Sequence, residues 1–242
     1  MKRLNNYISN EKISSLDEYI NEKLKINKST KYQYTYHPKD RDELRKIIEE
    51  RLAKYKDADF NDIDVSKITN MSRLFQGLDP HNIDISEWDV SNVEDMYGMF
   101  YGCQNLDCDL SEWNVSKVKT MAYMFYDCQK FNSELSDWKV YEVISMHSMF
   151  FNCRNFNSNL SQWDVSSVKA MNTMFYGCEN FNSDLSKWKL SNVRETCAMF
   201  CYCKKFNCDL SNWDMSNVTD MRTMFHGCES LKNIPSWYIN HK

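Results

Sequence analysis

The chain has 242 residues, of which 42% are hydrophobic, and it carries 30 Lys and Arg against 34 Asp and Glu, a net charge of −4. This content is enough for a sizeable core, and no stretch approaches the roughly 20 apolar residues of a membrane-spanning helix. The charge is uneven: residues 1–58 hold 14 basic and 10 acidic side chains (+4), and residues 59–242 hold 16 and 24 (−8). Because acidic surfaces repel phosphates, we expect no nucleic acid on the second part.

Residues 1–30 are interpreted as a leader or arm. Leu16, Tyr19, Ile20 and Leu24 have helical spacing, which predicts one short amphipathic helix. A flexible leader, a partner-binding arm and a dimer contact are all compatible with this pattern, and the oligomeric state is left open. The segment has no apolar run of about 7–15 residues, so it does not look like an export signal and we expect a cytoplasmic protein. A cell-surface protein whose leader has been removed is the alternative.

Residues 31–59 are interpreted as an N-terminal cap made of a strand and a helix. Tyr32, Tyr34 and Tyr36 alternate with polar residues, as in a strand. Asp40 and Glu43 form a capping box that begins a helix. The apolar face of this helix would consist of Leu44, Ile47, Ile48, Leu52 and Tyr55. Since the helix leads directly into the next segment, we expect it to cover the end of that segment's core.

Residues 60–242 are organised by a period of 25 residues. Phenylalanine, tryptophan and cysteine each recur at one position of this repeat. The three columns are Phe75, Phe100, Phe125, Phe150, Phe175, Phe200 and Phe225; Trp88, Trp113, Trp138, Trp163, Trp188 and Trp213; and Cys103, Cys128, Cys153, Cys178, Cys203 and Cys228. A fixed period between about 20 and 50 residues indicates stacked units that bury their apolar faces against one another.

Each repeat is predicted to contain a short helix and a short strand. The apolar residues with the spacing of one helix face are Val118, Met121, Met124, Phe125 and Cys128, and Ser116 is a candidate N-cap. Phe131, Ser133 and Leu135 alternate with polar residues, which is typical of a strand. The expected fold class is an α/β repeat solenoid of about seven units, similar to leucine-rich repeats, with parallel strands in one layer and helices in another.

The repeat resembles the BspA-type leucine-rich repeat family. The resemblance rests on Trp-Asp-Val-Ser-Asn-Val at residues 88–93, followed by Met96, Met99, Phe100 and Cys103, and on Phe-Asn-Ser-Asp-Leu-Ser at residues 181–186. It extends from about residue 60 to the C-terminus. That family is abundant in surface proteins and small proteins of low-GC bacteria. The resemblance implies a right-handed solenoid with a binding or adhesive role, and it implies no catalytic residue.

The outward side chains of the expected strands form the first candidate binding site. This polar ladder consists of Asp107, Asp109, Asn132, Glu134, Asn157, Asn159, Asn182, Asp184, Asn207 and Asp209. Neighbouring strands of a sheet lie about 4.8 Å apart, so these side chains would stack in rows. Such rows could bind a basic partner or a hard cation such as calcium. Alternatively, the asparagines could hydrogen-bond to one another and to loop backbone and only stiffen the stack.

A second candidate binding site is an aromatic column, which consists of Tyr101, Tyr126, Phe151 and Tyr176. If the helix continues to these positions, the rings point outward, and rows of exposed aromatic side chains are typical of protein interfaces. If the helix ends before them, the rings pack over neighbouring units instead.

No pattern in the chain supports catalysis, a cofactor or a metal. The five histidines share no column, and no Gly-rich phosphate loop occurs, so we expect no enzyme. Cys197, Cys201 and Cys203 lie close together but form no Cys-x-x-Cys pair, and we interpret them as substitutions at permissive positions. The six cysteines of the column are expected to be reduced and buried like small hydrophobes. On that interpretation, Cys153→Ser should cost about 1–3 kcal/mol, because its hydroxyl would have no planned partner.

The functional hypothesis is a non-enzymatic protein–protein interaction module. Because the polar ladder is acidic, we expect its partner to carry a basic patch, and we expect no membrane association. An intracellular inhibitor or decoy of bacterial or phage origin is one form of this hypothesis. The alternative is a cell-surface adhesin, which is what the family resemblance suggests.

Overall fold

The computed structural model describes residues 34–55 and 57–239 and divides the chain into two compact units, Met1–Tyr34 and Thr35–Lys242. The expectations for residues 1–30 and for the beginning of the cap strand lie outside the described residues. In the described part, the regular elements are the helices α2 (Arg41–Leu52) and α3 (Ser236–Ile239) and the strands β1 (Ala58–Asp59) and β2 (Ile83–Asp84). All four elements belong to the Thr35–Lys242 unit.

Helix α2 forms where the capping box predicts a helix. The N-cap Asp40 accepts a hydrogen bond from the Glu43 backbone N–H at 2.9 Å, which satisfies a donor that the first turn leaves unpaired. Leu44, Ile48 and Leu52 are buried in the same core as the repeats. Tyr55, which was expected on this face, lies beyond the end of the helix and is 65% exposed.

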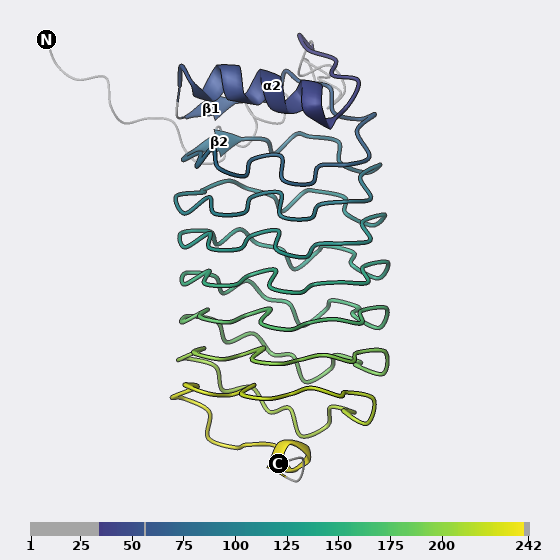
Figure 1. Cartoon of the computed structure of the whole chain (residues 1–242), viewed down its shortest axis with the longest axis vertical. Helices are drawn as coiled ribbons and strands as arrows, with labels where there is room; N and C mark the ends of the chain where they lie inside the picture. Colours follow the sequence, from purple (N-terminus) through teal and green to yellow (C-terminus); the bar gives the residue numbers. More distant parts are fainter. Residues whose placement is uncertain (1–33, 56, 240–242) are drawn as a thin grey trace, which may run out of the picture. The chain divides into compact units, whose positions relative to one another are not determined.

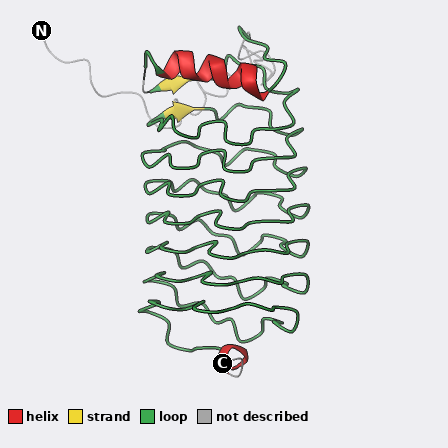
Figure 2. Ribbon diagram, viewed as in Figure 1, coloured by secondary structure: helices red, strands yellow, loops and turns green. Residues whose placement is uncertain are grey.

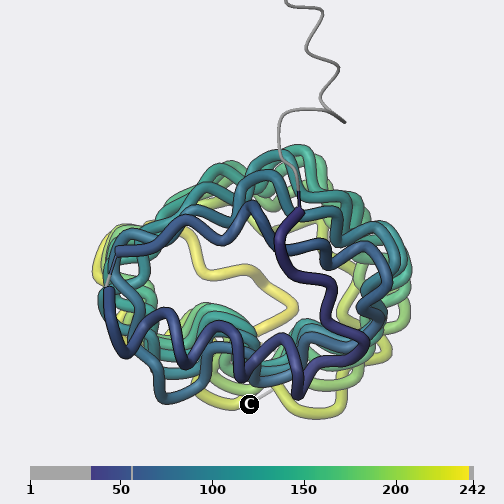
Figure 3. The backbone as a smooth tube through the Cα atoms, turned by 90° about the horizontal axis from the view of Figure 1, so that it is seen from above, coloured from purple at the N-terminus to yellow at the C-terminus, as the bar shows by residue number. Residues whose placement is uncertain are grey.

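Successive 25-residue segments of the unit lie one beneath another, and we call each segment a coil (Figure 1). Seen end-on, the coils superimpose around a common interior (Figure 3). Parallel backbone bridges connect each coil to the next at one position of the repeat. The chain of bridges runs Asn70, Asp95, Thr120, Ser145, Ala170, Glu195, Asp220.

The strand expected at residues such as Phe131–Leu135 is present only in the first coils, as the parallel pair β1–β2 and the bridge from Asn82 to Asp107. Farther along the chain, side chains take the place of the missing backbone bonds. The Ser133 hydroxyl accepts a hydrogen bond from the backbone N–H of Leu110, one coil earlier, at 2.9 Å. Equivalent serines do the same in the following coils. The position predicted for the strand is therefore held together mainly by side-chain hydrogen bonds.

The prediction of a helix in each repeat is wrong, because the coils consist of consecutive turns (Figure 2). In one coil, Met124 N–H donates to Met121 C=O and Cys128 N–H donates to Phe125 C=O, which are the bonds of four-residue turns. Tyr123 and Asp127 have φ values of +59° and +58°. This left-handed conformation costs an L-residue roughly 1–2 kcal/mol and interrupts a right-handed helix wherever it occurs.

These turns also explain why the sequence imitates a helix. Each four-residue turn begins and ends on a fully buried apolar residue, and the two residues between them are on average less buried. Met121 and Met124 bound one turn, and Phe125 and Cys128 bound the next; all four are fully buried. A chain of such turns repeats apolar residues at intervals of three, and that interval is close to the period of a helix.

The N–H groups that a helix would have satisfied internally bond to the next coil instead. Alternate residues donate to carbonyls 24 positions ahead: Met121 to Ser145, Tyr123 to His147, Phe125 to Met149, and Asp127 to Phe151, at 2.7–3.0 Å. We call the four N–H groups of a coil its donor row and the four carbonyls its acceptor row. Because buried backbone groups need partners, this pairing is what makes the turn conformation tolerable.

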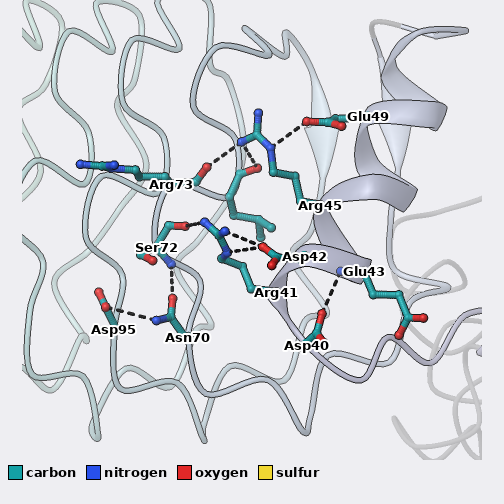
Figure 4. Close-up of polar contacts among 11 residues, drawn as sticks. Asp40, Arg41, Asp42, Glu43, Arg45, Glu49, Asn70, Ser72, Arg73 and Asp95 are labelled. Carbon is teal, nitrogen blue, oxygen red and sulfur yellow. Dashed lines mark hydrogen bonds and ion pairs between the residues drawn. The ribbon is translucent and has the colours of Figure 1, made fainter.

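The first coil has no preceding coil to donate to its acceptor row, and two arginines of α2 donate to three of its four carbonyls (Figure 4). Arg41 donates to the carbonyl of Ser72 at 2.9 Å. Arg45 donates to the carbonyls of Leu74 and Gln76 at 3.1 and 3.0 Å. The two arginines are one helical turn apart, so their guanidinium groups reach neighbouring carbonyls of the row.

The interior consists of side-chain columns that run from coil to coil. Rings of the phenylalanine column stack with centroids 5.1–5.9 Å apart. Each tryptophan indole N–H donates to a backbone carbonyl of the preceding coil at 2.8–3.0 Å. The indole N–H groups are therefore buried with their hydrogen bonds satisfied.

The cysteine column also forms hydrogen bonds, which its interpretation as a set of small hydrophobes omitted. Cys153 Sγ lies 2.9 Å from the carbonyl oxygen of Phe125, in the preceding coil, and the other five columnar cysteines make the equivalent contact. Burial raises the pKa of the Cys103 thiol to about 12, so the thiol remains protonated and able to donate. All ten cysteines of the chain are free.

The last coil is covered by a segment that the sequence did not reveal. Trp237, in α3, stacks on Trp213 at 6.3 Å and donates to the Leu210 carbonyl, as the columnar tryptophans do. It lies 24 residues after Trp213 rather than 25, and so it falls outside the register of the tryptophan column. Tyr238 packs edge-on against Phe225 at 5.1 Å.

The turn conformation predicts an unusual response to glycine. Thr223 is exposed, has a φ of +53°, and donates through its hydroxyl to its neighbour Arg222. Thr223→Gly should raise the free energy of unfolding by about 0.5–1 kcal/mol, because glycine adopts this conformation without steric cost. Urea denaturation of wild type and variant measures the difference. Ser167→Gly, at a position without positive φ, is the control and should lower stability. A helix at residue 223 would make Thr223→Gly destabilising as well.

The thiol hydrogen bond changes the expectation for Cys153. Cys153→Ala should lower the free energy of unfolding by about 1–3 kcal/mol, because it empties a packed position and leaves the Phe125 carbonyl without its donor. Cys153→Ser keeps a donor for the Phe125 carbonyl and should cost less than Cys153→Ala, whereas the sequence alone gave the serine hydroxyl no partner. Urea denaturation under reducing conditions tests the order. Cys197→Ala, at a half-exposed position, is the control and should have a smaller effect.

Candidate functional site

All ten residues of the polar ladder are exposed. They lie in two columns of the coils, and the small residue between them points inward: Ser133, Ser158 and Ser183 are buried. The alternation of exposed and buried side chains that the sequence predicted is therefore present at these positions, although the backbone there is mostly not a strand.

The asparagines of the first column bond to the backbone of the next coil. The side-chain oxygen of Asn132 accepts from the Asn157 N–H at 2.8 Å, and that of Asn157 accepts from the Asn182 N–H at 2.8 Å. Asn182 and Asn207 continue the series at 2.9 Å. The hydrogen bonds from these asparagines to loop backbone, one of the alternatives from the sequence, are therefore present. They use the side-chain amide oxygens and fix the positions of the side chains.

The acidic residues of the second column bond within their own coil. Oδ1 of Asp109, Asp184 and Asp209 each accepts from the N–H of the serine two residues later, at 2.9 Å. This local turn fixes the carboxylate on the surface. Three carboxylates of this column also accept from a side chain of the next coil: Asp109 from the Ser133 hydroxyl at 3.5 Å, Glu134 from the Ser158 hydroxyl at 3.4 Å, and Asp184 from the Cys208 thiol at 3.5 Å.

These contacts keep the carboxylates ionised. Hydrogen bonds from the backbone N–H and the hydroxyl of Ser186 lower the pKa of Asp184. The hydroxyl and backbone N–H of Ser211 likewise lower the pKa of Asp209. Donors aimed at a carboxylate favour its charged form, so both groups carry a full negative charge near neutral pH.

The two columns together form a band of one charge sign. From residue 82 to residue 209 they hold six carboxylates, six amides and no basic side chain; the carboxylates are Asp84, Asp107, Asp109, Glu134, Asp184 and Asp209. Near its C-terminal end the band borders an open groove of about 490 Å³, lined by Asn182, Asp184, Ser186, Asn207, Asp209 and Asn212 among others. Both carboxylates of that groove belong to the ladder.

The aromatic column is a continuous stack of half-buried rings. Tyr101, Tyr126, Phe151 and Tyr176 lie face to face with centroids 4.5–4.6 Å apart and planes within 5° of parallel. The rings pack on neighbouring coils and reach the surface, so each of the two sequence-based alternatives describes part of their position. Because each inner ring is covered on both faces, the column presents ring edges and hydroxyl groups rather than flat stacking surfaces.

Further aromatic residues, outside the column defined from sequence, border this stack. Tyr123 contacts Tyr97, Tyr101 and Tyr126 with centroids 5.4–6.3 Å apart. His147 Nε2 lies 2.7 Å from the Tyr123 hydroxyl. Tyr97 and His147 share one column of the repeat, two coils apart, and Tyr123 belongs to the adjacent column, so no single column groups all three.

Within residues 34–55 and 57–239, no three His, Cys, Asp or Glu side chains are arranged to hold a metal ion. Cys197, Cys201 and Cys203 are free thiols. None of the helices in these residues is long and apolar enough to span a membrane.

Comparison with known proteins gives one match. Neither the curated proteins nor the solved structures contain a significant relative of this chain. A family model described as "Mycoplasma protein of unknown function, DUF285" matches twice, over residues 43–163 and residues 133–238. The two overlapping matches span the helix α2 and nearly all of the coils. The chain therefore belongs to this Mycoplasma family, DUF285.

Proposed function

We propose that this protein is a non-enzymatic binding module that takes a basic surface of another protein on its polar ladder. The observation that carries the proposal is the band of six carboxylates, uninterrupted by a basic side chain, on one face of the coils. The charge sets the partner's chemistry: lysine and arginine side chains are the groups that such a band attracts.

The ladder side chains are ordered before any partner arrives. Asn132, Asn157 and Asn182 are each tied to the next coil, and Asp109 and Asp184 are tied to their own turns. Side chains that are already fixed lose little conformational entropy on binding. The hydrogen bonds inside the stack thus support binding as well as stability.

The bound carboxylates retain capacity for a partner. In Asp109, Asp184 and Asp209, Oδ1 accepts the serine N–H. A second donor also reaches Oδ1 in each residue, so both of its lone pairs are used, and Oδ2 is the oxygen that can still accept from a guanidinium or ammonium group. The groove beside Asp184 and Asp209 has room for a long basic side chain to lie along the coil surface.

The aromatic column is the second candidate surface. Its stacked rings expose edges and the hydroxyls of Tyr101, Tyr126 and Tyr176. Ring edges carry partial positive charge and hydroxyls donate hydrogen bonds, so this surface suits carbonyl or carboxylate groups rather than a basic patch. The two surfaces therefore predict partners of opposite character.

The wider classification belongs to the same proposal. The stacked 25-residue coils and the family match support a repeat solenoid of the leucine-rich-repeat kind, with the BspA-type motif as its nearest resemblance. An intracellular inhibitor or decoy of bacterial or phage origin is the form of the function that we propose. The BspA-type motif of residues 88–93 favours a cell-surface adhesin as the second candidate.

Neutralising the ladder tests the binding surface. The triple variant Asp109→Asn, Asp184→Asn and Asp209→Asn removes three charges while each asparagine can still accept the serine N–H. The probe is a nine-residue polyarginine peptide, with binding measured by fluorescence anisotropy at low and high salt. Wild type should bind in a salt-dependent manner, and the variant should bind about tenfold more weakly, as expected for three exposed charge pairs.

The control variant removes the same number of charges from another column. Asp89, Asp164 and Asp214 are exposed and accept the N–H of Ser91, Ser166 and Ser216 in the same type of turn. Their triple replacement by asparagine should leave peptide binding near the wild-type value. Equal weakening by both variants would show that only net charge matters and would remove the ladder from the proposal.

A second measurement addresses the natural partner. Proteins that co-purify with wild type from cell lysate should be lost from the ladder variant and retained by the control variant. Retention by the ladder variant, together with loss from a Tyr126→Ala, Phe151→Ala, Tyr176→Ala variant, would identify the aromatic column as the binding surface.

A further inference from the structure

The last coil has a donor row with no coil to receive it. In an inner coil, the N–H groups of Met171, Thr173 and Gly177 donate to carbonyls of the next coil at 2.8–2.9 Å. The equivalent groups of the last coil belong to Met221, Thr223 and Gly227. None of these three donates to another residue of the described part of the chain.

The other end of the stack shows that such a row requires partners. There, Arg41 and Arg45 donate to the acceptor row of the first coil (Figure 4). An unpaired backbone group that is withdrawn from water costs free energy, so one end of the ladder of backbone bonds is closed by side chains. The same contacts block head-to-tail stacking, because the arginines of a second copy already donate to three of the four acceptor carbonyls that it would offer.

Helix α3 completes the side-chain columns of the last coil without completing its donor row. Trp237 continues the tryptophan stack, and Tyr238 covers Phe225. The hydroxyl of Tyr238 hydrogen-bonds with the backbone of Met224 and Phe225, so it lies at the Phe225 position of the row. Toward the ends of the row, Thr223 remains exposed and Gly227 half-exposed.

We infer that the donor row of the last coil binds a segment of a partner polypeptide that adopts the turn conformation of a coil, through that segment's backbone carbonyls. The three unpaired donors are two and four residues apart, so they match the carbonyls of the first, third and seventh residues of the segment. As in strand addition at a sheet edge, main-chain hydrogen bonds would supply the affinity, but the bound segment follows the turns of a coil. The row offers N–H donors only, and so it selects carbonyl-bearing chains.

The coils themselves define which segments fit. The acceptor row of one inner coil comprises the carbonyls of Ala170, Asn172, Met174 and Tyr176, and the chain there has positive φ at Thr173 and Gly177. A binding segment must adopt the same conformation at two positions four residues apart. Glycine and asparagine do so most readily, and proline cannot. The preferred partner therefore carries Gly or Asn at that spacing.

The test uses a synthetic peptide with the sequence of residues 170–177, Ala-Met-Asn-Thr-Met-Phe-Tyr-Gly, which contains all four acceptor carbonyls and no cysteine. Amide hydrogen exchange of the full chain is followed by NMR. Without peptide, the amides of Met221, Thr223 and Gly227 should exchange rapidly, and those of Met171, Thr173 and Gly177 slowly. With peptide at about ten times its Kd, the first three should slow by about tenfold.

The matched control is the same peptide with Thr173→Pro, which retains every acceptor carbonyl but cannot adopt positive φ. It should give no protection. Slow exchange of the three amides in the free protein would show that the row is already covered and would overturn the inference. So would peptide binding that leaves their exchange unchanged. Protection by inorganic phosphate but not by the peptide would also overturn it, and would identify an anion site formed by the N–H groups.

Discussion

The backbone hydrogen bonds between successive coils are the constraint on which the rest of this structure depends. Each coil donates alternate N–H groups to carbonyls 24 residues ahead, and neither partner could be buried without the other. This pairing permits non-glycine residues such as Tyr123 and Thr173 to remain at positive φ. It also sets the spacing at which the phenylalanine, tryptophan and cysteine columns meet. The stacking of the rings follows from the register of the backbone.

Much of the core could be predicted from sequence because burial follows the 25-residue period. Every residue of the phenylalanine and tryptophan columns is buried. The outward direction of residues such as Asn157 and Asp184 followed from their alternation with small residues. The conformation of the backbone could not be predicted in the same way. The turns bounded by Met121 and Met124 repeat apolar residues at nearly the helical interval. What distinguishes them from a helix is the positive φ of Tyr123 and the hydrogen bonds to the next coil, neither of which the apolar pattern reveals.

Two kinds of contact could not be predicted from the sequence. In one kind, a residue lies outside the 25-residue period; in the other, a residue forms a bond that is unusual for its type. Cysteine is usually interpreted as a small hydrophobe, yet Cys153 donates to a carbonyl. Trp237 lies one residue before the position that the 25-residue period of the tryptophan column predicts. Arg41 and Arg45 look like ordinary surface residues of an amphipathic helix, and only the position of the first coil shows that they close its carbonyl row. In the polar ladder, the exposed side chains could be located from the sequence. The sequence could not decide whether they bind a partner or stabilise the stack by hydrogen bonds between coils. The structure shows such hydrogen bonds by the asparagine oxygens and leaves the carboxylates available.

The direction of the inter-coil bonds makes the two ends of the stack chemically different. One end presents carbonyls that arginines must close, and the other presents N–H groups beside which Trp237 and Tyr238 are placed. A new coil therefore cannot be added at the first end without displacing α2. Between the ends, every coil has the same donors on one side and acceptors on the other. Genes of this type should consequently lengthen or shorten by in-frame duplication or loss of about 75 nucleotides within the interior, while the two terminal segments are inherited as a matched pair.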